Sequence, residues 1–513
     1  MKYLALHRRP LLVLAVLLFA AVWVKNAWVC DDAYINFRSL DQLRAGHGPI
    51  WNPGERVQVY TSVLWYWLQA PLRLVTADVY ASVLLLSLTC GLVTLGAVRR
   101  LFQHDRSVLM LVLLMVGSAG FMDFTSSGLE NPLIYLICVL LLDAFFTVAR
   151  TPGGDPSVAA PLRRLLILAG TALLVRHDLA LLWLPPVVQV IIRHRRLWPW
   201  RTWLATMLLA AAPLLLWSAF ALFYYGSPWP NAALAKLSTG MPRGEVMRQG
   251  LAYLGSHRVD PLFAATMVAG LCLAFWRRPS LGLALGMVLH IVYLVWSGGD
   301  FMAGRFLSSV FLVAAILVVR ELENLPGIVG RWVPQGVVLL MAVLLPGSPL
   351  TSSVKLDDQT VRHGVAHERG VYFQSTSLWV RRVTPLEQFP VHEWATDGRY
   401  FRNRDDKLVG KDNVGFFGYT TGLEKLVIDR LAITSPFLAR IPVTTAPEGW
   451  RVGHLHRVMP RGYNRTLQTG VNSLAGPAMR DLYDDLHLAT SAPLLTPARF
   501  GAIWRLNTGH HRR

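Results

Sequence analysis

Apolar segments recur along the chain up to residue 346, and they constrain its fold more than any other feature. A helix of about 20 apolar residues crosses the hydrocarbon core of a bilayer. The segments predict a polytopic α-helical membrane protein with about eleven transmembrane helices. They span residues 10–29, 79–98, 107–122, 131–149, 165–175, 179–192, 202–224, 261–275, 280–297, 305–320 and 333–346.

The composition agrees with a membrane protein. Hydrophobic residues make up 53% of the chain and charged residues 16%, whereas soluble domains carry about 25% charged residues. The formal net charge is +19, and both the positive-inside rule and anionic lipids account for such an excess of Lys and Arg. Because no nucleic-acid-binding motif accompanies the charge, we expect the lipid bilayer as a partner and no nucleic acid.

Basic residues set the predicted orientation. Clusters around Arg99, Arg163 and Arg277 fall in alternate loops, which are therefore predicted to be cytoplasmic. The segment 165–192 allows two interpretations, because a single helix there would bury the charged triplet Arg176–Asp178 inside the membrane. Burying ionised groups in hydrocarbon costs several kcal/mol, so a break that lifts the triplet to the outer surface is favoured. The other polar loops then face the extracytoplasmic side.

The composition changes where the last apolar segment ends. Short β-rich runs such as Leu426–Ile428 and an amphipathic stretch around Met479–Leu488 predict a small mixed α/β domain. We therefore expect a transmembrane domain at residues 1–347, with a first extracytoplasmic loop at 31–78, and a soluble extracytoplasmic domain at 348–513.

Two adjacent carboxylates, Asp31 and Asp32, follow directly on the first apolar segment. Partial desolvation and mutual repulsion should raise the pKa of at least one of them toward the range useful for a proton acceptor. A hydrated acidic helix end without chemistry is the alternative interpretation. The adjacent oxygens also suit a divalent cation, although no other feature requires a metal, and the four cysteines fit no zinc-site spacing.

An ordered series of motifs accompanies this acidic pair through nearly the whole chain. It comprises Asp31–Ile35, Tyr60–Trp65, Ser127–Glu130, Tyr225–Pro228 with Asn231 and Lys236, Gly298–Met302 with Arg305, Glu368–Gly370, Val414–Tyr419, Ile428–Arg430, Leu438–Arg440 and Trp450–His454. The series resembles the GT-C superfamily of membrane glycosyltransferases. Within that class the chain is similar to the terminal arabinofuranosyltransferases of actinobacterial cell walls and their bacterial relatives.

The resemblance implies an enzyme that transfers a sugar, by similarity arabinofuranose, from a polyprenyl-phosphate donor to an extracytoplasmic glycan or glycoprotein acceptor. It also implies a multi-pass protein of the bacterial inner membrane with its active site on the extracytoplasmic side. Relatives usually carry a proline after the arginine of the 176 site, where this chain has His177.

Such a transfer needs a base for the acceptor hydroxyl, and Asp31 or Asp32 is the candidate at the lipid–water boundary. It also needs cations that hold the departing phosphate, because charge-assisted contacts to phosphate oxygens are strong. The candidate cations are Lys236, Arg305 and Arg176.

Four further residues are expected to support the site. A carboxylate such as Glu130 or Asp300 would stabilise a developing oxocarbenium ion, although Glu130 also suits a helix N-terminus. Asn231 and Tyr60 are included as candidates because they belong to motifs of the ordered series.

Each candidate cation has a structural alternative. Lys236 fits a side chain that snorkels to the membrane surface. Arg305 fits an ion pair with Asp300, and Arg176 fits one with Asp178. For the whole chain, the alternatives are a transporter or flippase for the lipid-linked sugar and a non-catalytic partner in envelope assembly. Transporters tend to show internal repeats and charges near the membrane midplane, whereas this chain shows no repeat.

Overall fold

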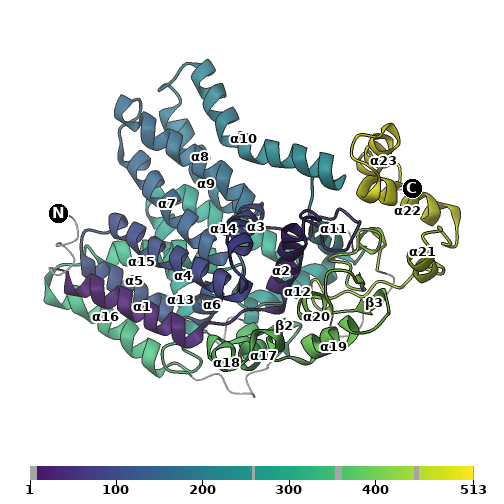
Figure 1. Cartoon of the computed structure of the whole chain (residues 1–513). Helices are drawn as coiled ribbons and strands as arrows, with labels where there is room; N and C mark the ends of the chain where they lie inside the picture. The colour runs from purple at the N-terminus through teal and green to yellow at the C-terminus, as the bar shows by residue number, and fades with distance from the viewer. Residues whose placement is uncertain (1–8, 238, 257–259, 353–360, 444–449, 512–513) are drawn as a thin grey trace. The chain divides into compact units, whose positions relative to one another are not determined.

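The structure is a computed structural model that describes residues 9–237, 239–256, 260–352, 361–443 and 450–511 (Figure 1). The described chain is mostly helical and contains two short sheets of two strands each. It divides into two compact units, each assembled from separate stretches of sequence. The first unit comprises Met1–Val29, Val83–Leu214 and Val246–Leu378, and the second comprises Cys30–Ser82, Leu215–Glu245 and Trp379–Arg513.

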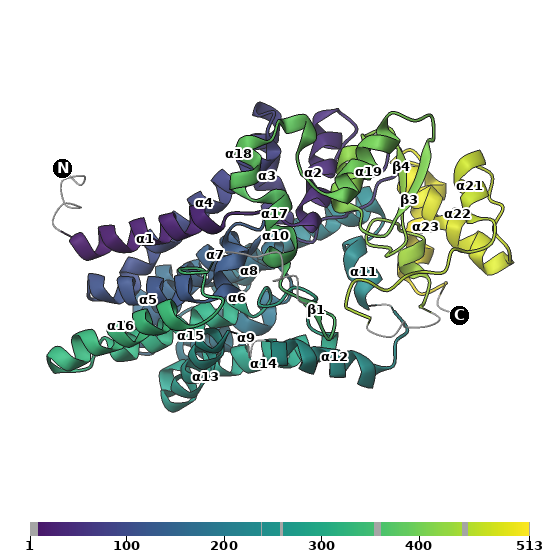
Figure 2. The same ribbon diagram turned by 90° about the horizontal axis from the view of Figure 1, so that it is seen from below.

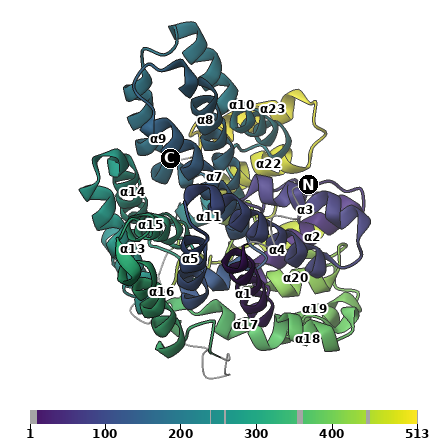
Figure 3. The ribbon, with the colours of Figure 1, turned by 90° about the vertical axis from the view of Figure 1, so that its left-hand side faces the viewer.

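The first unit is built almost entirely of helices. In chain order these are α1 (Pro10–Asn26), most of α4 (Val79–Val98), η2 (Arg99–Leu101), α5 (Asp105–Gly117), α6 (Ala119–Met122), η3 (Asp123–Thr125), α7 (Asn131–Arg150), η4 (Pro156–Val158), α8 (Ala159–Val175), α9 (Leu179–His194), the first part of α10 (Trp200–Tyr225), most of α12 (Arg243–Gly255), α13 (Pro261–Trp276), η6 (Arg278–Ser280), α14 (Leu281–Ser297), α15 (Ser308–Leu322), α16 (Gly327–Leu344) and α17 (Glu368–Thr376). The short strands β1 (Val361–Arg362) and β2 (Val365–Ala366) pair antiparallel. Figure 3 shows α13, α14 and α15 side by side.

The length and apolar composition of the helices are those of a multi-pass membrane protein. The predicted apolar segments each lie largely within one helix, except 107–122, which is divided between α5 and α6 by a bend of 90°. Among the described residues, 5 helices are long and apolar enough to cross a membrane, or up to 7 if each of two bent helix pairs counts as one span. Three further apolar helices are shorter. The polytopic helical architecture is therefore confirmed, and the number of about eleven spans stays a prediction.

The chain breaks between α8 and α9, as the charged triplet Arg176–Asp178 predicts. The backbone of Arg176 is extended at the end of α8, and Asp178 takes the N-cap position of α9. A carboxylate is favourable there, because the N-terminus of a helix carries a partial positive charge. The interpretation of 165–192 as two helical segments is therefore correct.

The second unit contains shorter helices and one parallel pair of strands. In chain order its elements are α2 (Asp31–Arg44), α3 (Val63–Val75), the last part of α10, α11 (Asn231–Leu237), most of α18 (Leu378–Val383), η8 (Leu386–Gln388), α19 (Glu393–Arg402), β3 (Leu408–Lys411), α20 (Gly415–Thr421), β4 (Leu426–Asp429), η9 (Leu438–Arg440), α21 (Tyr463–Thr469), α22 (Pro477–Ser491) and α23 (Pro497–Asn507). Figure 2 shows β3 beside β4. Strand β4 and helix α22 occupy the predicted β-rich and amphipathic stretches, so the C-terminal part is mixed as expected, although its strands are few.

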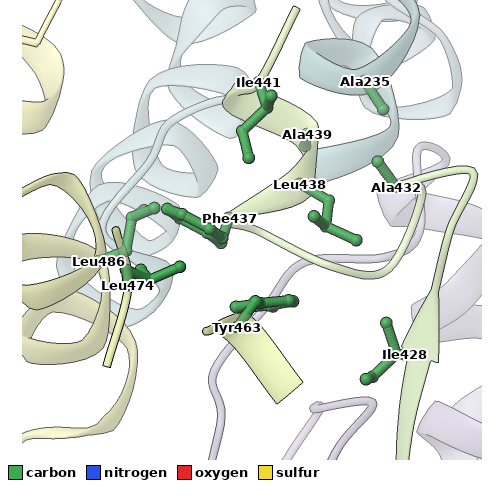
Figure 4. Packing of buried hydrophobic residues seen from close by; sticks show 10 residues of the cluster. All are labelled: Ala235, Ile428, Ala432, Phe437, Leu438, Ala439, Ile441, Tyr463, Leu474 and Leu486. Atoms are coloured by element: carbon green, nitrogen blue, oxygen red, sulfur yellow. The ribbon is translucent and has the colours of Figure 1, made fainter. Parts of the chain in front are cut away.

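A hydrophobic cluster holds the second unit together (Figure 4). The rings of Phe437 and Tyr463 lie 5.0 Å apart, centroid to centroid. Burial of each large apolar side chain contributes roughly 1.5–3 kcal/mol, so the cluster fixes α11 against β4 and α22. Its members are Ala235, Ile428, Ala432, Phe437, Leu438, Ala439, Ile441, Tyr463, Leu474 and Leu486.

The predicted boundary between residues 347 and 348 concerns which parts of the chain fold as separate domains, and it stays a prediction. In space, the segment Cys30–Ser82 and the segment Trp379–Arg513 pack in one compact unit. The first loop is thus built together with the C-terminal part of the chain, although the 296 residues 83–378 lie between the two segments in sequence.

Candidate active site

Asp31 opens helix α2 in the second unit and is 6% exposed. Its carboxylate accepts two backbone hydrogen bonds from the first turn of α20: Oδ2 accepts from the N–H of Gly415 at 3.1 Å and Oδ1 from that of Phe416 at 2.7 Å. A Cβ atom on Gly415 would lie 1.9 Å from the backbone oxygen of Asp31. Only glycine therefore permits this close approach of α20 to the start of α2.

The environment of Asp31 changes its acidity. Burial is the main cause, and it raises the pKa of Asp31 to about 7. Repulsion from Asp32 and Asp429 acts in the same direction, while the hydrogen bonds from Phe416 and Gly415 oppose it. Asp31 therefore changes its charge close to neutral pH, which is the range that a proton-exchanging group needs.

Asp32 has a different environment, although it is the next residue on the same helix. It is only half-buried, so its carboxylate is the more accessible of the pair. Successive residues of a helix point in directions about 100° apart. The two carboxylates therefore point in different directions. Asp31 faces α20 inside the unit, and Asp32 is accessible to a reactant.

Arg38 anchors α2 two turns after Asp31, on the same face of the helix, and was missed as a site residue by the sequence analysis. It is fully buried, and its guanidinium donates to the carbonyl oxygens of Trp51 at 3.0 Å, Gly422 at 2.6 Å and Lys425 at 2.7 Å, and also to that of Gly418. The guanidinium also lies over the Trp51 ring, 4.5 Å from its centroid. These contacts fix α2 against the last part of α20 and against the turn that follows α20.

Tyr60 lies in a buried aromatic cluster of the second unit. Its hydroxyl is 2.8 Å from the hydroxyl of Tyr225, which donates to the carbonyl of Pro49 at 3.1 Å. Its ring stacks on Tyr66 with centroids 3.8 Å apart. Tyr60 therefore connects the first loop to the end of α10, and its contacts are structural.

Asn231 and Lys236 both lie on α11. The side chain of Asn231 donates to the carbonyls of Ala432 at 3.0 Å and Ile433 at 2.9 Å, so it fastens α11 to the turn after β4. Lys236 is half-buried, and a Cβ atom on Gly453 would lie 3.0 Å from its Cε. The predicted cation therefore stands beside the Trp450–His454 motif.

Positive charge gathers around this motif. Burial, followed by the charges of Arg451 and Lys236, lowers the pKa of His454 to about 3, so this histidine is neutral at physiological pH. Lys236 and Arg451 thus act on the same imidazole, which indicates a local positive potential. Such a potential suits an anionic ligand.

The first unit holds a separate group of charges around Glu130, which is 3% exposed. Its Oε1 accepts from Arg176 Nη1 at 3.0 Å and from Arg305 Nη2 at 3.2 Å. Arg176 also forms a bidentate pair with Asp178, with both contacts at 2.9 Å. The Arg305 Nη1 lies 3.7 Å from Oδ2 of Asp300.

These contacts fix the charge state of the carboxylates. Burial alone would raise the pKa of Glu130, but Arg305 and Arg176 outweigh it and lower that pKa. The pKa of Asp178 falls to about 2, because Arg176 likewise outweighs the effect of burial. The two guanidinium groups therefore face three carboxylates, those of Glu130, Asp178 and Asp300. The ion pairs considered as structural alternatives, Arg176 with Asp178 and Arg305 with Asp300, both occur in the structure.

The nine predicted site residues thus fall into two groups, one in each unit. The second unit holds Asp31, Asp32, Tyr60, Asn231 and Lys236, and the first holds Glu130, Arg176, Asp300 and Arg305. Within the described ranges, no group of three or more His, Cys, Asp or Glu side chains is arranged to hold a metal ion.

A second anchor of the first unit also escaped the sequence analysis. Arg369, from a motif quoted there without a role, is 1% exposed. Its Nε donates to Asp123 at 2.6 Å and its Nη1 to Asn26 at 2.7 Å. His367 lies 2.8 Å from the other oxygen of Asp123. The sequence signal for this anchor was the charged pair Glu368–Arg369, which lies beside apolar helices. Such a pair requires a partner, and the sequence alone did not identify it.

Comparisons with known proteins agree with this architecture, although no family model matches the chain. The chain is 25% identical to a terminal beta-(1->2)-arabinofuranosyltransferase of Mycobacterium tuberculosis, over 87% of the chain and 83% of the relative. It is 30% identical to the protein of the same name from Corynebacterium glutamicum, over 61% of the chain and 51% of the relative. The fold is similar to that of ArnT from Cupriavidus metallidurans, solved bound to undecaprenyl phosphate, with a TM-score of 0.50, 14% identity and coverage of 82% of this chain and 86% of ArnT.

Proposed function

We propose a specific reaction for this chain, which is a multi-pass membrane glycosyltransferase of the GT-C fold and a homologue of terminal arabinofuranosyltransferases. It transfers a sugar from a polyprenyl-phosphate donor to a glycan or glycoprotein, and similarity to the named relatives favours arabinofuranose. The reaction takes place on the extracytoplasmic side of the bacterial inner membrane, as the alternation of basic loops predicts. The homologues favour this enzyme over the transporter and assembly-partner alternatives.

The observation that carries the proposal is that the two carboxylates at the start of α2 have different environments. One is held by backbone hydrogen bonds, and the other is accessible. Asp32 is the proposed general base, because its carboxylate is the more accessible. Asp31 is a positioning residue, because both of its oxygens accept backbone hydrogen bonds from α20. It holds the first turn of α2, and with it Asp32, in a fixed orientation.

The proposed step is a displacement at the anomeric carbon. The acceptor oxygen forms a bond to that carbon while its proton passes to Asp32. The bond between the anomeric carbon and the phosphate oxygen breaks, and its electron pair leaves with the polyprenyl phosphate. General-base assistance of this kind contributes about 10²–10⁴-fold to the rate.

Cations are proposed to hold the departing phosphate. Lys236 is supported by its position beside Arg451 and the Trp450–His454 motif. Arg176 and Arg305 remain candidates, because a guanidinium carries five N–H donors and can contact a phosphate while keeping its carboxylate partner. Glu130 would then orient these two arginines. No divalent cation is needed for this scheme, although the acidic pair would accommodate one.

Transfer by the purified full-length protein tests the proposal. The assay uses a synthetic polyprenyl-phosphate arabinofuranose and an oligosaccharide acceptor, and NMR of the product identifies the new linkage. Asp32→Asn should reduce turnover about 10²-fold or more and leave donor binding unchanged, because the loss falls on the transition state. The exposed Asp405, changed to Asn, serves as the matched control. Wild-type turnover by the Asp32 variant would move the base elsewhere, and the absence of transfer by the wild-type protein would refute the function.

A further inference from the structure

Helix α23 of the second unit turns an apolar surface outward. Leu495, just before the helix, is 78% exposed, and Phe500 and Trp504 are 45% and 71% exposed. Phe500 and Trp504 are four residues apart, so they are neighbours on one face of the helix. A contiguous exposed apolar surface marks a site of contact with a protein or a membrane. The exposed residues between 493 and 508 are all uncharged, namely Pro493, Leu495, Pro497, Ala498, Phe500, Trp504, Asn507 and Thr508.

The two charged side chains of α23 both have partners within the unit. Arg499 is fully buried, and its guanidinium donates to the carbonyls of Phe223 at 2.6 Å and Tyr224 at 3.0 Å. Arg505 forms a bidentate pair with Asp485, with contacts of 2.8 Å and 2.5 Å. Neither arginine therefore leaves an uncompensated charge beside the exposed rings.

Helix α22, which packs on α23, has the opposite kind of outer surface. A helix that faces water carries polar and charged residues opposite its buried face. This is the pattern of α22, whose exposed residues are Pro477, Ala478, Arg480, Asp481, Asp484 and His487. Because α23 departs from this pattern, the two neighbouring helices are suited to different surroundings.

Helix α23 is fastened to the end of α10 (Figure 1). The bonds from Arg499 reach the last turn of α10, and the side chain of Asn507 donates to the carbonyl of Gly226 at 2.9 Å. The ring of Phe223 lies 5.8 Å from the Arg499 guanidinium, centroid to Cζ, and Phe223 is itself exposed. The apolar surface of α10 therefore continues onto α23.

The length of α10 indicates what surrounds this continuous surface. Its 26 residues extend for about 39 Å at 1.5 Å per residue. The hydrocarbon core of a bilayer is about 30 Å thick, and about 40–45 Å including the headgroup layers. The sequence contains no charged residue between Arg201 and Lys236, and the exposed residues of α10 after Pro213 are all apolar. If α10 spans the bilayer, its end reaches the headgroup layer, and α23 is attached to that end.

We propose that the outer face of α23 lies in the membrane surface, with Phe500 and Trp504 inserted among the phospholipid acyl chains next to the headgroups. Helices of this kind lie along the surface and bury their apolar face about 5–10 Å into the boundary between headgroups and chains. The C-terminal part of the chain, expected from the sequence to be soluble, is then held at the membrane by α23 as well as by α10. The inference does not depend on the proposed reaction.

Nitroxide spin labels test the depth of α23 in the full-length protein, reconstituted into phosphatidylcholine vesicles. Cys272, the exposed native cysteine, is changed to Ser, and the other three cysteines are buried. Labels are then attached to Trp504→Cys or to Phe500→Cys. Electron paramagnetic resonance measures the access of each label to oxygen, which concentrates in hydrocarbon, and to a nickel chelate, which stays in water.

Two further labels calibrate the measurement. Leu216→Cys, on the exposed side of α10, is the reference for lipid, and Asp484→Cys, on the exposed side of α22, is the reference for water. We expect both α23 labels to resemble the lipid reference, with several-fold less access to nickel than the water reference. Labels that resemble the water reference would overturn the inference. Labels shielded from both reagents would also overturn it, because they would indicate contact with protein or with a second copy of the chain.

A charge substitution provides a second measurement. Trp504→Glu should lift the face out of the hydrocarbon, so the access of the label at position 500 to nickel should increase several-fold. His487→Glu, on the exposed side of α22, is the matched control and should leave that label unchanged. Thermal unfolding shows which variants are folded, and Leu495→Cys replaces a label position that is not tolerated. An unchanged label in the folded Trp504→Glu variant would contradict the inference. Because no step measures transfer, a failure of the proposed function would leave these results unaffected.

Discussion

Asp31 in the second unit and Glu130 in the first are two buried carboxylates with opposite electrostatics. They are 6% and 3% exposed, so burial penalises the charged form of both. Asp31 is held by two neutral backbone N–H groups, and Glu130 is held by two guanidinium groups. The pKa of Asp31 rises to about 7 mainly through burial, while that of Glu130 falls because the arginines outweigh burial.

The comparison shows that the partner, and not the depth of burial, decides the charge state. Hydrogen bonds from N–H dipoles reduce the desolvation penalty of Asp31 without cancelling it. Two full positive charges cancel that of Glu130 completely. Asp31 can therefore exchange a proton near neutral pH, whereas Glu130 is a permanent anion. The start of α2 suits proton transfer, and the Glu130 cluster suits a fixed ionic framework.

The largest expected effect on stability comes from breaking that framework. Glu130→Gln keeps the size of the side chain but leaves Arg176 and Arg305 without their shared anion. Loss of one partner from a buried ion pair costs about 3–5 kcal/mol, and chemical unfolding in mixed micelles measures it. The exposed pair Arg404–Asp406 provides the control, because Asp406→Asn should leave the unfolding curve unchanged. A stable Glu130 variant would mean that Asp178 and Asp300 alone neutralise the two arginines.

A smaller effect is expected where Asp31 meets α20. Gly415→Ala would place a Cβ atom 1.9 Å from the backbone oxygen of Asp31, so the two helix starts must move apart. Overpacking of this kind costs about 1–3 kcal/mol, and turnover should fall as well, because Asp32 loses its fixed orientation. Gly410→Ala on β3 is the control, since its Cβ atom would meet nothing closer than 3.9 Å. Normal stability of the Gly415 variant would contradict the close contact.

The sequence was sufficient to predict the helical membrane architecture. Apolar runs of defined length, the charged break at Arg176–Asp178 and the β-rich run Leu426–Ile428 that forms β4 are local patterns, and each specifies a local structure. The acidic pair was also identifiable, because two carboxylates at the end of an apolar run are unusual in chemical terms. These features depend on neighbouring residues only.

The partners of the site residues were not predictable in the same way. The N–H groups that bind Asp31 belong to residues more than 380 positions later in the chain, and the carbonyls of Gly418, Gly422 and Lys425 that bind Arg38 are similarly distant. Local patterns carry no information about such pairs. Arg38 therefore received no role from its local sequence, although it is fully buried. Likewise, no local pattern indicates that Arg176 and Arg305 share Glu130 as a partner.

The smallest effect tests the titration of Asp31 directly. Its pKa is raised from the ordinary value of 3.8 to about 7 in the folded protein. Between these values the folded state holds a proton that the unfolded state has released, so the free energy of unfolding decreases as the pH rises from 4 to 7.

Asp31→Asn cannot titrate, and its unfolding free energy should therefore decrease less steeply in this range. Between pH 6 and pH 7 the difference between wild type and variant should change by about 1 kcal/mol. Burial also raises the pKa of Glu55 to about 7 and that of Asp429 to about 6, but both groups remain in the variant and cancel in the comparison. Asp405→Asn should keep the wild-type slope. Parallel pH profiles for the wild type and the Asp31 variant would show that Asp31 stays ionised, and the contrast with Glu130 would then disappear.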